Sequence, residues 1–226
     1  MAQEILIIGE SGSGKSTSLE NLNPESTFII NVGQKPMPFR GWKGKYKKLS
    51  KETPDGNYIE TDQSSTIVQT MKHINENMPN IKRVVVDDFQ YVMANEFMRR
   101  ANERGFDKFT EIGLHAWEVA HSGKNMRDDI TFVMIGHAEQ STDLSGNRRL
   151  KFKTVGKLVD NVITMEGMFT VVLFTDVSVN SDSERVYNFI TQSDGTTTAK
   201  SPKGMFDFKI PNDIETAIKN INQYYN

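Results

Sequence analysis

The sequence of 226 residues contains no cysteine. Disulfide bonds, thiolate metal sites and cysteine nucleophiles are therefore excluded, which suits a protein of a reducing cytoplasm. Long apolar runs are also lacking, since none approaches the roughly 18 residues that a membrane-spanning helix needs. The start of the chain does not follow the pattern of a signal peptide. We therefore expect a cytoplasmic protein that makes no membrane contact.

An excess of charge of one sign is lacking as well, because 27 Lys and Arg residues oppose 29 Asp and Glu residues. A general polycation is excluded, so any contact with nucleic acid must use local basic patches. The histidines do not show the spacing with acidic residues that is typical of a transition-metal site. The length suits one domain, and neither a repeat nor a long linker divides residues 1–226, so we expect a single domain.

Apolar segments with the length of buried strands alternate with segments of helical periodicity. Strands are expected at residues 4–8, 27–32, 83–87 and 130–135, with a short extended piece at 58–61. Helices are expected at residues 15–22, 65–77 and 89–126, the last interrupted near Gly105 and Gly113. This alternation predicts an α/β fold with a mostly parallel sheet flanked by helices.

The remaining segments have other patterns. A helix is expected near residues 155–164, followed by an antiparallel hairpin at the sheet edge from residues 169–177 and 185–192. A last helix is expected at residues 212–224, with Asp213 near its start. Residues 33–56 are rich in Gly, Pro and Lys, so we expect an irregular, basic insert there.

The segment GESGSGKST begins at Gly9, directly after the first expected strand, and matches the phosphate-loop pattern G-x-x-x-x-G-K-[ST] in full. Glycines let backbone N–H groups turn inward around phosphates, and the helix expected after the loop points its N-terminus at the anion. Lys15 supplies a positive charge to the outer phosphates, and Ser16 can ligate Mg²⁺. ATP and Mg²⁺ are the expected ligands. The predicted binding residues are Gly9, Glu10, Ser11, Gly12, Ser13, Gly14, Lys15, Ser16 and Thr17.

A second apolar strand, in RVVVDDFQY, ends in Asp87 and Asp88. In phosphate-loop enzymes an acidic residue at such a strand end holds Mg²⁺ through water, and we predict this role for Asp87. The alternative is that the acid only caps the helix that follows. Asp88 is a candidate for the carboxylate that polarises the attacking water, with Glu60 and Glu139 as competitors.

The segment ITFVMIGHAEQ ends a further apolar strand with Gly136 and His137. We expect this strand to lie beside the phosphate-loop strand, so that its polar end can sense the γ-phosphate. His137 is predicted to hydrogen-bond that phosphate or the attacking water. The alternative is a loop histidine whose partners are backbone groups.

Two basic stretches are candidates for polymer binding. FRGWKGKYKKLSK, residues 39–51, combines cations for phosphates with Trp42 and Tyr46 for base stacking, which suits single-stranded nucleic acid. The alternative is that these aromatics cover the edge of the core. SGNRRLKFKTVGK, residues 145–157, can contact DNA, reach into a neighbouring subunit's nucleotide site, or form an ordinary charged loop. The candidates are Arg40, Lys43, Lys47, Lys48, Arg148, Arg149, Lys151, Lys153 and Lys157.

Taken in order, GESGSGKST, NVGQKPMPFRG, VVVDDFQY, MIGHAE and KTVGKLVDN resemble a RecA-type ATPase core. More narrowly, the chain resembles the compact phage-encoded ATPases of the Sak recombinase and single-strand-annealing group. The resemblance implies an ATPase of the host cytoplasm that binds single-stranded DNA and assists annealing or strand exchange in phage recombination. It also implies that residues 138–153 form the DNA-contacting loop. We expect a homo-oligomer, either a ring or a filament, and a single-strand-binding protein is a further candidate partner.

Two departures from the RecA pattern leave other functions open. The second strand ends in INVGQ, with Asn31 and Gln34 where these enzymes carry a catalytic glutamate. The phosphate loop also begins at residue 9, without the preceding segment that docks RecA subunits. The alternatives are an AAA-type remodelling ATPase for helicase loading or DNA packaging, a nucleotide or small-molecule kinase, and a nucleotide-dependent binding module without hydrolysis.

Overall fold

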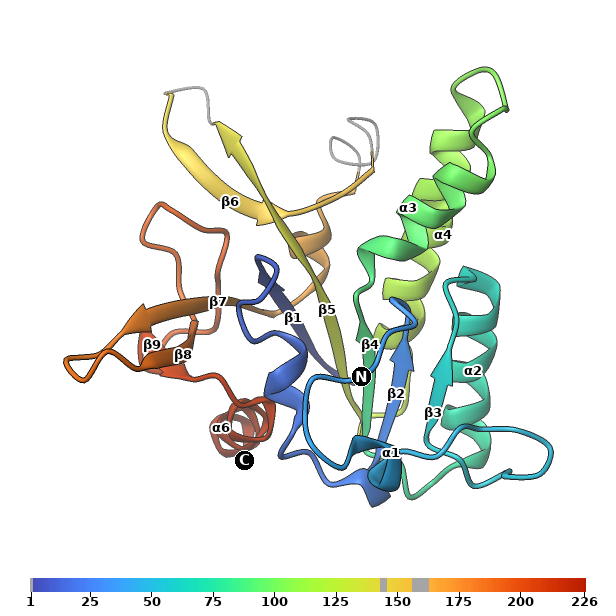
Figure 1. Cartoon of the computed structure of the whole chain (residues 1–226), viewed down its shortest axis with the longest axis horizontal. Helices are drawn as coiled ribbons and strands as arrows, with labels where there is room; N and C mark the ends of the chain where they lie inside the picture. The colour runs from blue at the N-terminus through green and yellow to red at the C-terminus, as the bar shows by residue number, and fades with distance from the viewer. Residues whose placement is uncertain (1, 143–145, 156–162) are drawn as a thin grey trace.

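A computed structural model describes residues 2–142, 146–155 and 163–226. The chain folds as α/β, with a mixed, mostly parallel sheet flanked by helices (Figure 1). The strands are β1 Gln3–Gly9, β2 Thr27–Asn31, β3 Tyr58–Glu60, β4 Arg83–Asp87, β5 Thr131–Thr142, β6 Arg148–Phe152, β7 Val171–Val179, β8 Arg185–Ile190 and β9 Lys209–Pro211. The α-helices are α1 Trp42–Lys45, α2 Ser64–Asn77, α3 Gln90–Arg99, α4 Asp107–Lys124 and α6 Ile214–Tyr225. Short 3₁₀ turns are η1 Ser16–Leu19, η2 Pro24–Ser26 and η3 Met165–Met168.

The strand order in the sheet is β3-β2-β4-β5-β1-β7-β8-β9, and β6 pairs with β5 outside this path. All pairs from β3 to β7 are parallel, whereas β8 and β9 continue the sheet antiparallel. β5 lies between β1, which precedes the phosphate loop, and β4, which ends in Asp87. The register pairs Gly9 with His137 and Asn31 with Asp87. The polar residues singled out in the sequence therefore meet at one edge of the sheet.

Both faces of the sheet are covered, because successive side chains of a strand point to opposite faces. On one face Leu6 and Ile8 of β1 pack in a cluster with the apolar sides of α2, α3 and α4. On the other face Ile5 and Ile7 pack with residues of η1 and α6. These residues of β1 are all fully buried, which explains why its sequence is a continuous apolar run.

Most of the expected elements are confirmed. Strands β1 to β4, helix α2 and the β7–β8 hairpin lie within a few residues of the sequence-based bounds. β5 extends to Thr142, well beyond its expected end at residue 135, and β6 and β9 were not expected. The side chain of Asp213 caps α6 by accepting a hydrogen bond from the N–H of Glu215, at 3.2 Å. The interruption near Gly105 is the turn between α3 and α4. That near Gly113 was wrong: α4 runs through this residue, which is buried in the helix interior.

The helix expected at residues 15–22 was wrong in type and length. Only the 3₁₀ turn Ser16–Leu19 forms, and the following turns close over three residues, from Glu20 N–H to Thr17 and from Leu22 N–H to Leu19. Asn23 then caps η2, which starts at Pro24. Proline disfavours helix in the residue before it, so the segment ends there instead of extending a regular helix.

The expected loop at residues 138–153 is instead a β-hairpin in its described part. β5 continues to Thr142 and pairs antiparallel with β6, with Ala138 opposite Phe152. Phe152 is buried against Gly136, where a Cβ atom would lie 2.2 Å from the ring. This packing holds the hairpin against the body of the sheet.

Two further expectations concern the chain after this hairpin. The β7–β8 hairpin was placed at the sheet edge, but β9 pairs with the outer side of β8 and forms the edge itself. The helix expected near residues 155–164 lies for the most part outside the described residues.

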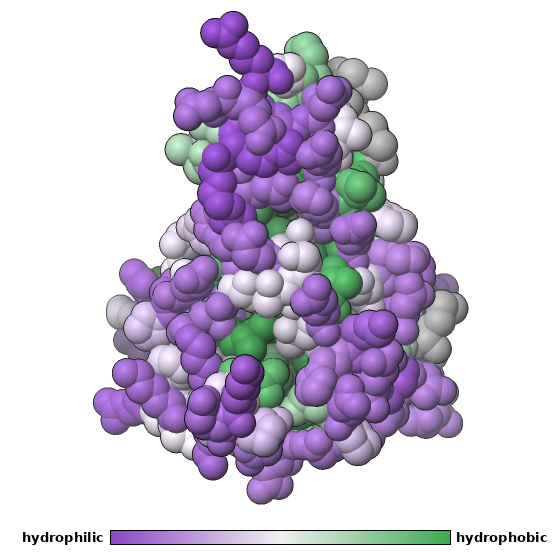
Figure 2. All heavy atoms as spheres, turned by 90° about the vertical axis from the view of Figure 1, so that its right-hand side faces the viewer, coloured by the Kyte–Doolittle hydropathy of each residue, from purple (hydrophilic) through white to green (hydrophobic). Residues whose placement is uncertain are grey.

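The helical side of the molecule, formed by α2, α3 and α4, is largely hydrophilic on its surface, with some apolar side chains between the polar ones (Figure 2). Among the described residues, we find no helix with the length and hydropathy required to cross a membrane.

Candidate functional site

A cleft of about 680 Å³ lies beyond the carboxyl ends of β1 and β4, beside His137 of β5. Ligands of open α/β sheets commonly bind at this edge, because the loops that follow parallel strands converge there. The cleft is lined by Ser11, Gly12, Gly14, Lys15, Ser16, Thr17, Ser18, Glu20, Asn21, Lys35, Pro36, Pro38, Asp88, His137, Tyr187, Pro211 and Asn212. It thus brings together most of the predicted phosphate loop, Asp88 and His137.

The phosphate loop has the backbone that its glycines were expected to permit. Gly12 and Gly14 have φ angles of 76° and 89°, in the left-handed region that favours glycine. The hydroxyl of Ser13 and the ammonium of Lys15 both donate to the carbonyl oxygen of Glu10, each at 2.7 Å. The loop is therefore closed on itself by side chains as well as by backbone.

Lys15 is buried, with 6% of its surface exposed. Burial lowers the pKa of its ammonium group, and the nearby carboxylates of Asp88 and Asp87 offset this only in part. A buried cation whose charge is incompletely balanced by its neighbours attracts an anion strongly. This electrostatic state suits the predicted role of Lys15 toward phosphates.

Ser16 and Asp87 join the phosphate loop to β4. The Ser16 hydroxyl donates to Oδ1 of Asp87 at 3.0 Å. Burial raises the pKa of Asp87 to about 6, and the adjacent charge of Asp88 acts in the same direction. A buried carboxylate beside a hydroxyl is an arrangement that a divalent cation would stabilise.

Asp88 lies in an unusual backbone conformation at the entrance to α3. Its φ angle is 60°, which is rare for a residue with a side chain. Gly33 makes room for it, because a Cβ atom at Gly33 would lie 2.6 Å from Oδ2 of Asp88. Strained residues of this kind are concentrated at functional sites.

The Asp88 carboxylate is buried between the side chains of Lys35 and His137. Lys35 Nζ lies 2.6 Å from Oδ2, and His137 Nε2 lies 3.5 Å from Oδ1. Burial alone would raise the pKa of Asp88, but the interactions with His137 and Lys35 outweigh burial and lower it. Asp88 is therefore ionised over the neutral pH range, as a general base must be.

His137 lines the cleft and has contacts through both its backbone and its ring. Its backbone N–H donates to Oε1 of Gln90 at 3.2 Å, and its ring meets the ring of Tyr91 edge to face. The imidazole faces Asp88 instead of a backbone group. This placement favours the predicted sensor position over the alternative of a loop histidine with backbone partners.

The two competing carboxylates lie elsewhere. Glu60 accepts a hydrogen bond from the Tyr58 hydroxyl and pairs with Lys48, both at 3.1 Å. Glu139 pairs with Lys151 across the β5–β6 hairpin at 3.3 Å. Neither carboxylate lines the cleft, so the geometry favours Asp88.

The aromatic residues of the basic stretch at residues 39–51 pack in the core. Phe39 and Tyr46 are buried, and Trp42 packs against the same cluster with its ring 5.5 Å from that of Tyr58. The alternative in which aromatics cover the core edge therefore fits better than base stacking. The cations predicted to contact nucleic acid are on the surface, namely Arg40, Lys43, Lys47 and Lys48.

In the second basic stretch, some cations have protein partners and others are exposed. Arg149 donates to the carbonyl oxygen of Thr197 at 2.9 Å and to the Ser193 hydroxyl at 3.1 Å, which fixes its guanidinium. Lys151 pairs with Glu139. Arg148 and Lys153 are exposed. Lys157 lies outside the described residues.

Several cleft residues were missed at the level of sequence. Lys35 follows β2, Tyr187 belongs to β8 and Asn212 follows β9. Lys35 could have been found from the rule that loops after parallel strands converge. Tyr187 and Asn212 reach the cleft through the antiparallel part of the sheet, where they lie next to Gly14.

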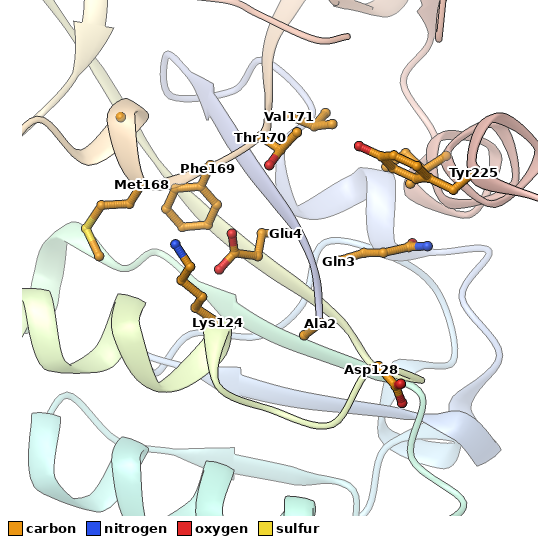
Figure 3. A pocket seen from close by; sticks show the side chains of 12 residues that line it. Ala2, Gln3, Glu4, Lys124, Asp128, Met168, Phe169, Thr170, Val171 and Tyr225 are labelled. Carbon is orange, nitrogen blue, oxygen red and sulfur yellow. The ribbon is translucent and has the colours of Figure 1, made fainter.

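A second cavity, of about 500 Å³, lies at the amino-terminal end of β1. Figure 3 shows Glu4 and Lys124 directed toward one another, beside the ring of Phe169. Burial raises the pKa of Glu4, and the charge of Lys124 opposes this. The phosphate loop leaves the opposite end of β1, so this cavity is separate from the cleft described above.

The residues of the main cleft fit a nucleoside triphosphate with Mg²⁺. Glycines in the left-handed region leave space on the loop, and a buried lysine supplies positive charge. No group of three or more acidic, histidine or cysteine side chains that could enclose a metal occurs in the described ranges. A donor set of one hydroxyl and one carboxylate instead suits Mg²⁺, which retains several waters and binds phosphate oxygens.

Comparison with protein-family models gives no match to this chain, and comparison with curated proteins gives none either.

Proposed function

We propose that this protein binds ATP with Mg²⁺ and hydrolyses it. The observation that carries the proposal is the 3.0 Å hydrogen bond from Ser16 to Asp87, which joins a complete phosphate loop to a buried acidic strand end. In this proposal Lys15 and the loop N–H groups hold the phosphates, while Ser16 and Asp87 hold the metal. Mg²⁺, when bound, would neutralise charge on the outer phosphates.

The proposed catalytic base is Asp88, with His137 as a second group on the γ-phosphate or the attacking water. Support comes from the burial of Asp88 beside the cleft and from its distance of 3.5 Å from His137. An ionised carboxylate with restricted freedom is suited to orient a water and to accept its proton. Asp88 takes the place of the glutamate that RecA-type enzymes carry after the second strand, where this chain has Asn31.

We further propose a RecA-like core that acts on single-stranded DNA in phage recombination. The insertion of β5 between the phosphate-loop strand and the acidic strand supports a core of this type. The position of the β5–β6 hairpin supports DNA binding, because Lys153 N–H donates to the carbonyl oxygen of His137 at 2.9 Å. A nucleotide-dependent change at His137 would thus reach a segment whose exposed cations suit phosphates. In a homo-oligomer, Arg148 could instead reach a neighbouring nucleotide site.

The test combines calorimetry with phosphate release. The purified chain should bind ATP in magnesium buffer, and Lys15→Ala should abolish both binding and turnover. Turnover should rise with single-stranded DNA more than with duplex DNA or without polymer. ADP formation that requires a nucleotide or metabolite acceptor would favour a kinase, and binding without turnover would favour a binding module. If neither ATP nor ADP binds, the proposal is wrong.

A further inference from the structure

Lys35 is the cation of the cleft for which the phosphate-loop pattern gives no role. It lies two residues after Gly33 and has a half-exposed side chain, with 54% of its surface accessible. Its ammonium group lies 2.6 Å from Oδ2 of Asp88, and the residue lines the same cleft as Lys15. The ion pair therefore occupies the carboxylate that the proposed function assigns to water activation.

An ion pair with Lys35 and activation of water are competing uses of the same carboxylate. The ammonium of Lys35 attracts the negative charge that must accept a proton, and its contact occupies one carboxylate oxygen. His137 faces the other oxygen, at 3.5 Å. If Lys35 left, Asp88 would keep His137 as the partner of Oδ1, and Oδ2 would become accessible to water in the cleft.

We propose that Lys35 distinguishes a nucleoside triphosphate from a diphosphate by exchanging Asp88 for the terminal phosphate. This inference rests on the proposed function of the cleft and adds a sensing residue to it. A terminal phosphate carries more negative charge than one carboxylate, and Lys35 is exposed enough to change partners without unfolding its surroundings. The exchange involves rotation of a long, flexible side chain.

The exchange at Lys35 would also affect Trp42 of the basic insert through two contacts. Asn31 Nδ2 donates to the carbonyl oxygen of Lys35 at 2.7 Å and to the Tyr58 hydroxyl at 2.6 Å. The ring of Tyr58 in turn packs on that of Trp42, which belongs to α1 of the insert. A change in the backbone at Lys35 is thus connected to Trp42 through one buried amide and one aromatic contact.

Gln34, which precedes Lys35, has a strained backbone conformation. Its φ angle is 51°, so the residue before Lys35 already lies in the left-handed region. A residue with a side chain is less stable in that region than in the right-handed or extended regions. Binding of the terminal phosphate can therefore release backbone strain as well as the ion pair.

Affinity for two nucleotides tests the sensing role. Calorimetry in Mg²⁺ buffer would compare the slowly hydrolysed analogue ATPγS with ADP in wild type, Lys35→Ala and Lys35→Arg. We expect Lys35→Ala to weaken ATPγS binding about tenfold and to leave ADP binding within about twofold, whereas Lys35→Arg keeps the preference. Lys51→Ala is the matched control, because Lys51 is an exposed lysine of the same insert that does not line the cleft.

Trp42 offers a readout of the connection to the insert. Trp117 is the other tryptophan of the chain, so Trp117→Phe leaves Trp42 as the single reporter. In this background, saturating ATPγS should change the Trp42 emission and saturating ADP should not. Lys35→Ala should remove this difference even at saturation.

Two results would overturn the inference while leaving the proposed function intact. One is a Lys35→Ala variant that keeps both the ATPγS preference and the emission change. The other is equal weakening of ATPγS and ADP, which would indicate a general structural effect. A wild-type protein that binds neither nucleotide would refute the proposed function itself, and the inference with it.

Discussion

Thr175 Oγ1 lies 2.6 Å from Ser13 Oγ and donates a hydrogen bond to it. Thr175 belongs to β7, so this bond ties the phosphate loop to the strand on the far side of β1 from β5. The same side chain explains why residue 9 is glycine, since a Cβ atom there would lie 1.7 Å from Thr175 Oγ1. The loop is thus shaped by a neighbour 162 positions away from Ser13.

Replacing Thr175 by Val should weaken nucleotide binding without unfolding the protein. The change removes one hydrogen bond to the loop, which is worth about 0.5 to 1.5 kcal/mol, so the Kd for ATP should rise roughly two- to tenfold. Thr175→Ser is the matched control, because it keeps the hydroxyl. Calorimetry gives the affinities and a thermal melt verifies the fold. Equal affinities in the three proteins would show that this bond does not order the loop.

Asp87→Asn should stabilise the protein when no nucleotide is bound. The same variant should lose the magnesium-dependent hydrolysis of ATP. The pKa of Asp87 is raised to about 6 by burial and by the charge of Asp88, above the ordinary value of 3.8. The ionised group therefore destabilises the fold above pH 6, and this cost disappears as the pH falls through 6 toward 4. We expect the free energy of unfolding of Asp87→Asn to exceed that of wild type by about 1 to 3 kcal/mol at pH 8, and this difference to become smaller as the pH falls. Urea titrations at pH 8 and pH 5 measure it, and a loss of stability at pH 8 would contradict the argument.

Gly136→Val should destabilise the protein by about 1 to 3 kcal/mol through overpacking. A Cβ atom at Gly136 would lie 2.2 Å from the ring of Phe152, which is buried and cannot give way cheaply. Gly44→Ala is the control, since a Cβ atom there meets nothing within 4 Å. Chemical denaturation should separate the two variants. Recovery of stability in Gly136→Val combined with Phe152→Ala would assign the effect to this contact.

The basic stretches should contribute separately to the salt dependence of DNA binding. Each phosphate contact on single strands adds about 0.7 to the slope of log K against log salt. Replacing Lys47 and Lys48 by Ala, or Arg148 and Lys153 by Ala, should therefore reduce that slope by about 1.4 per pair.

Fluorescence anisotropy with a labelled single strand at several salt concentrations gives this slope. Lys203 and Lys219 are exposed lysines outside both stretches, and their double Ala variant serves as control. A slope that changes as much in the control as in the paired variants would contradict a localised DNA surface.

The parts of the site that could be predicted are those encoded in a few adjacent residues. The phosphate loop depends on the local backbone freedom of Gly12 and Gly14, and Asp87 follows an apolar run that is long enough to be a buried strand. Each pattern is a short-range property, so the sequence displays it directly. The parallel pairing of β1 with β5, which brings Gly9 beside His137, followed from the same patterns.

The parts that could not be predicted depend on contacts between distant segments. Lys35 meets Asp88 only because β2 and β4 are neighbours in register, and Thr175 reaches Ser13 only because β7 pairs with β1. The aromatic residues of the basic insert were open to two interpretations, since burial of Tyr46 is decided by the packing of the whole face. Tertiary packing likewise overrides the local preference of Gly113, which α4 includes.

The strand β5 is one uninterrupted piece of 12 residues, from the buried centre of the sheet to the basic hairpin. At about 3.3 Å per residue it spans close to 40 Å, and a paired strand resists bending along most of that length. His137 and the outer end of the hairpin therefore belong to one continuous paired strand. Gly136 is the single glycine of this strand and packs against Phe152 of the hairpin, so we expect a displacement of His137 to be transmitted to the hairpin.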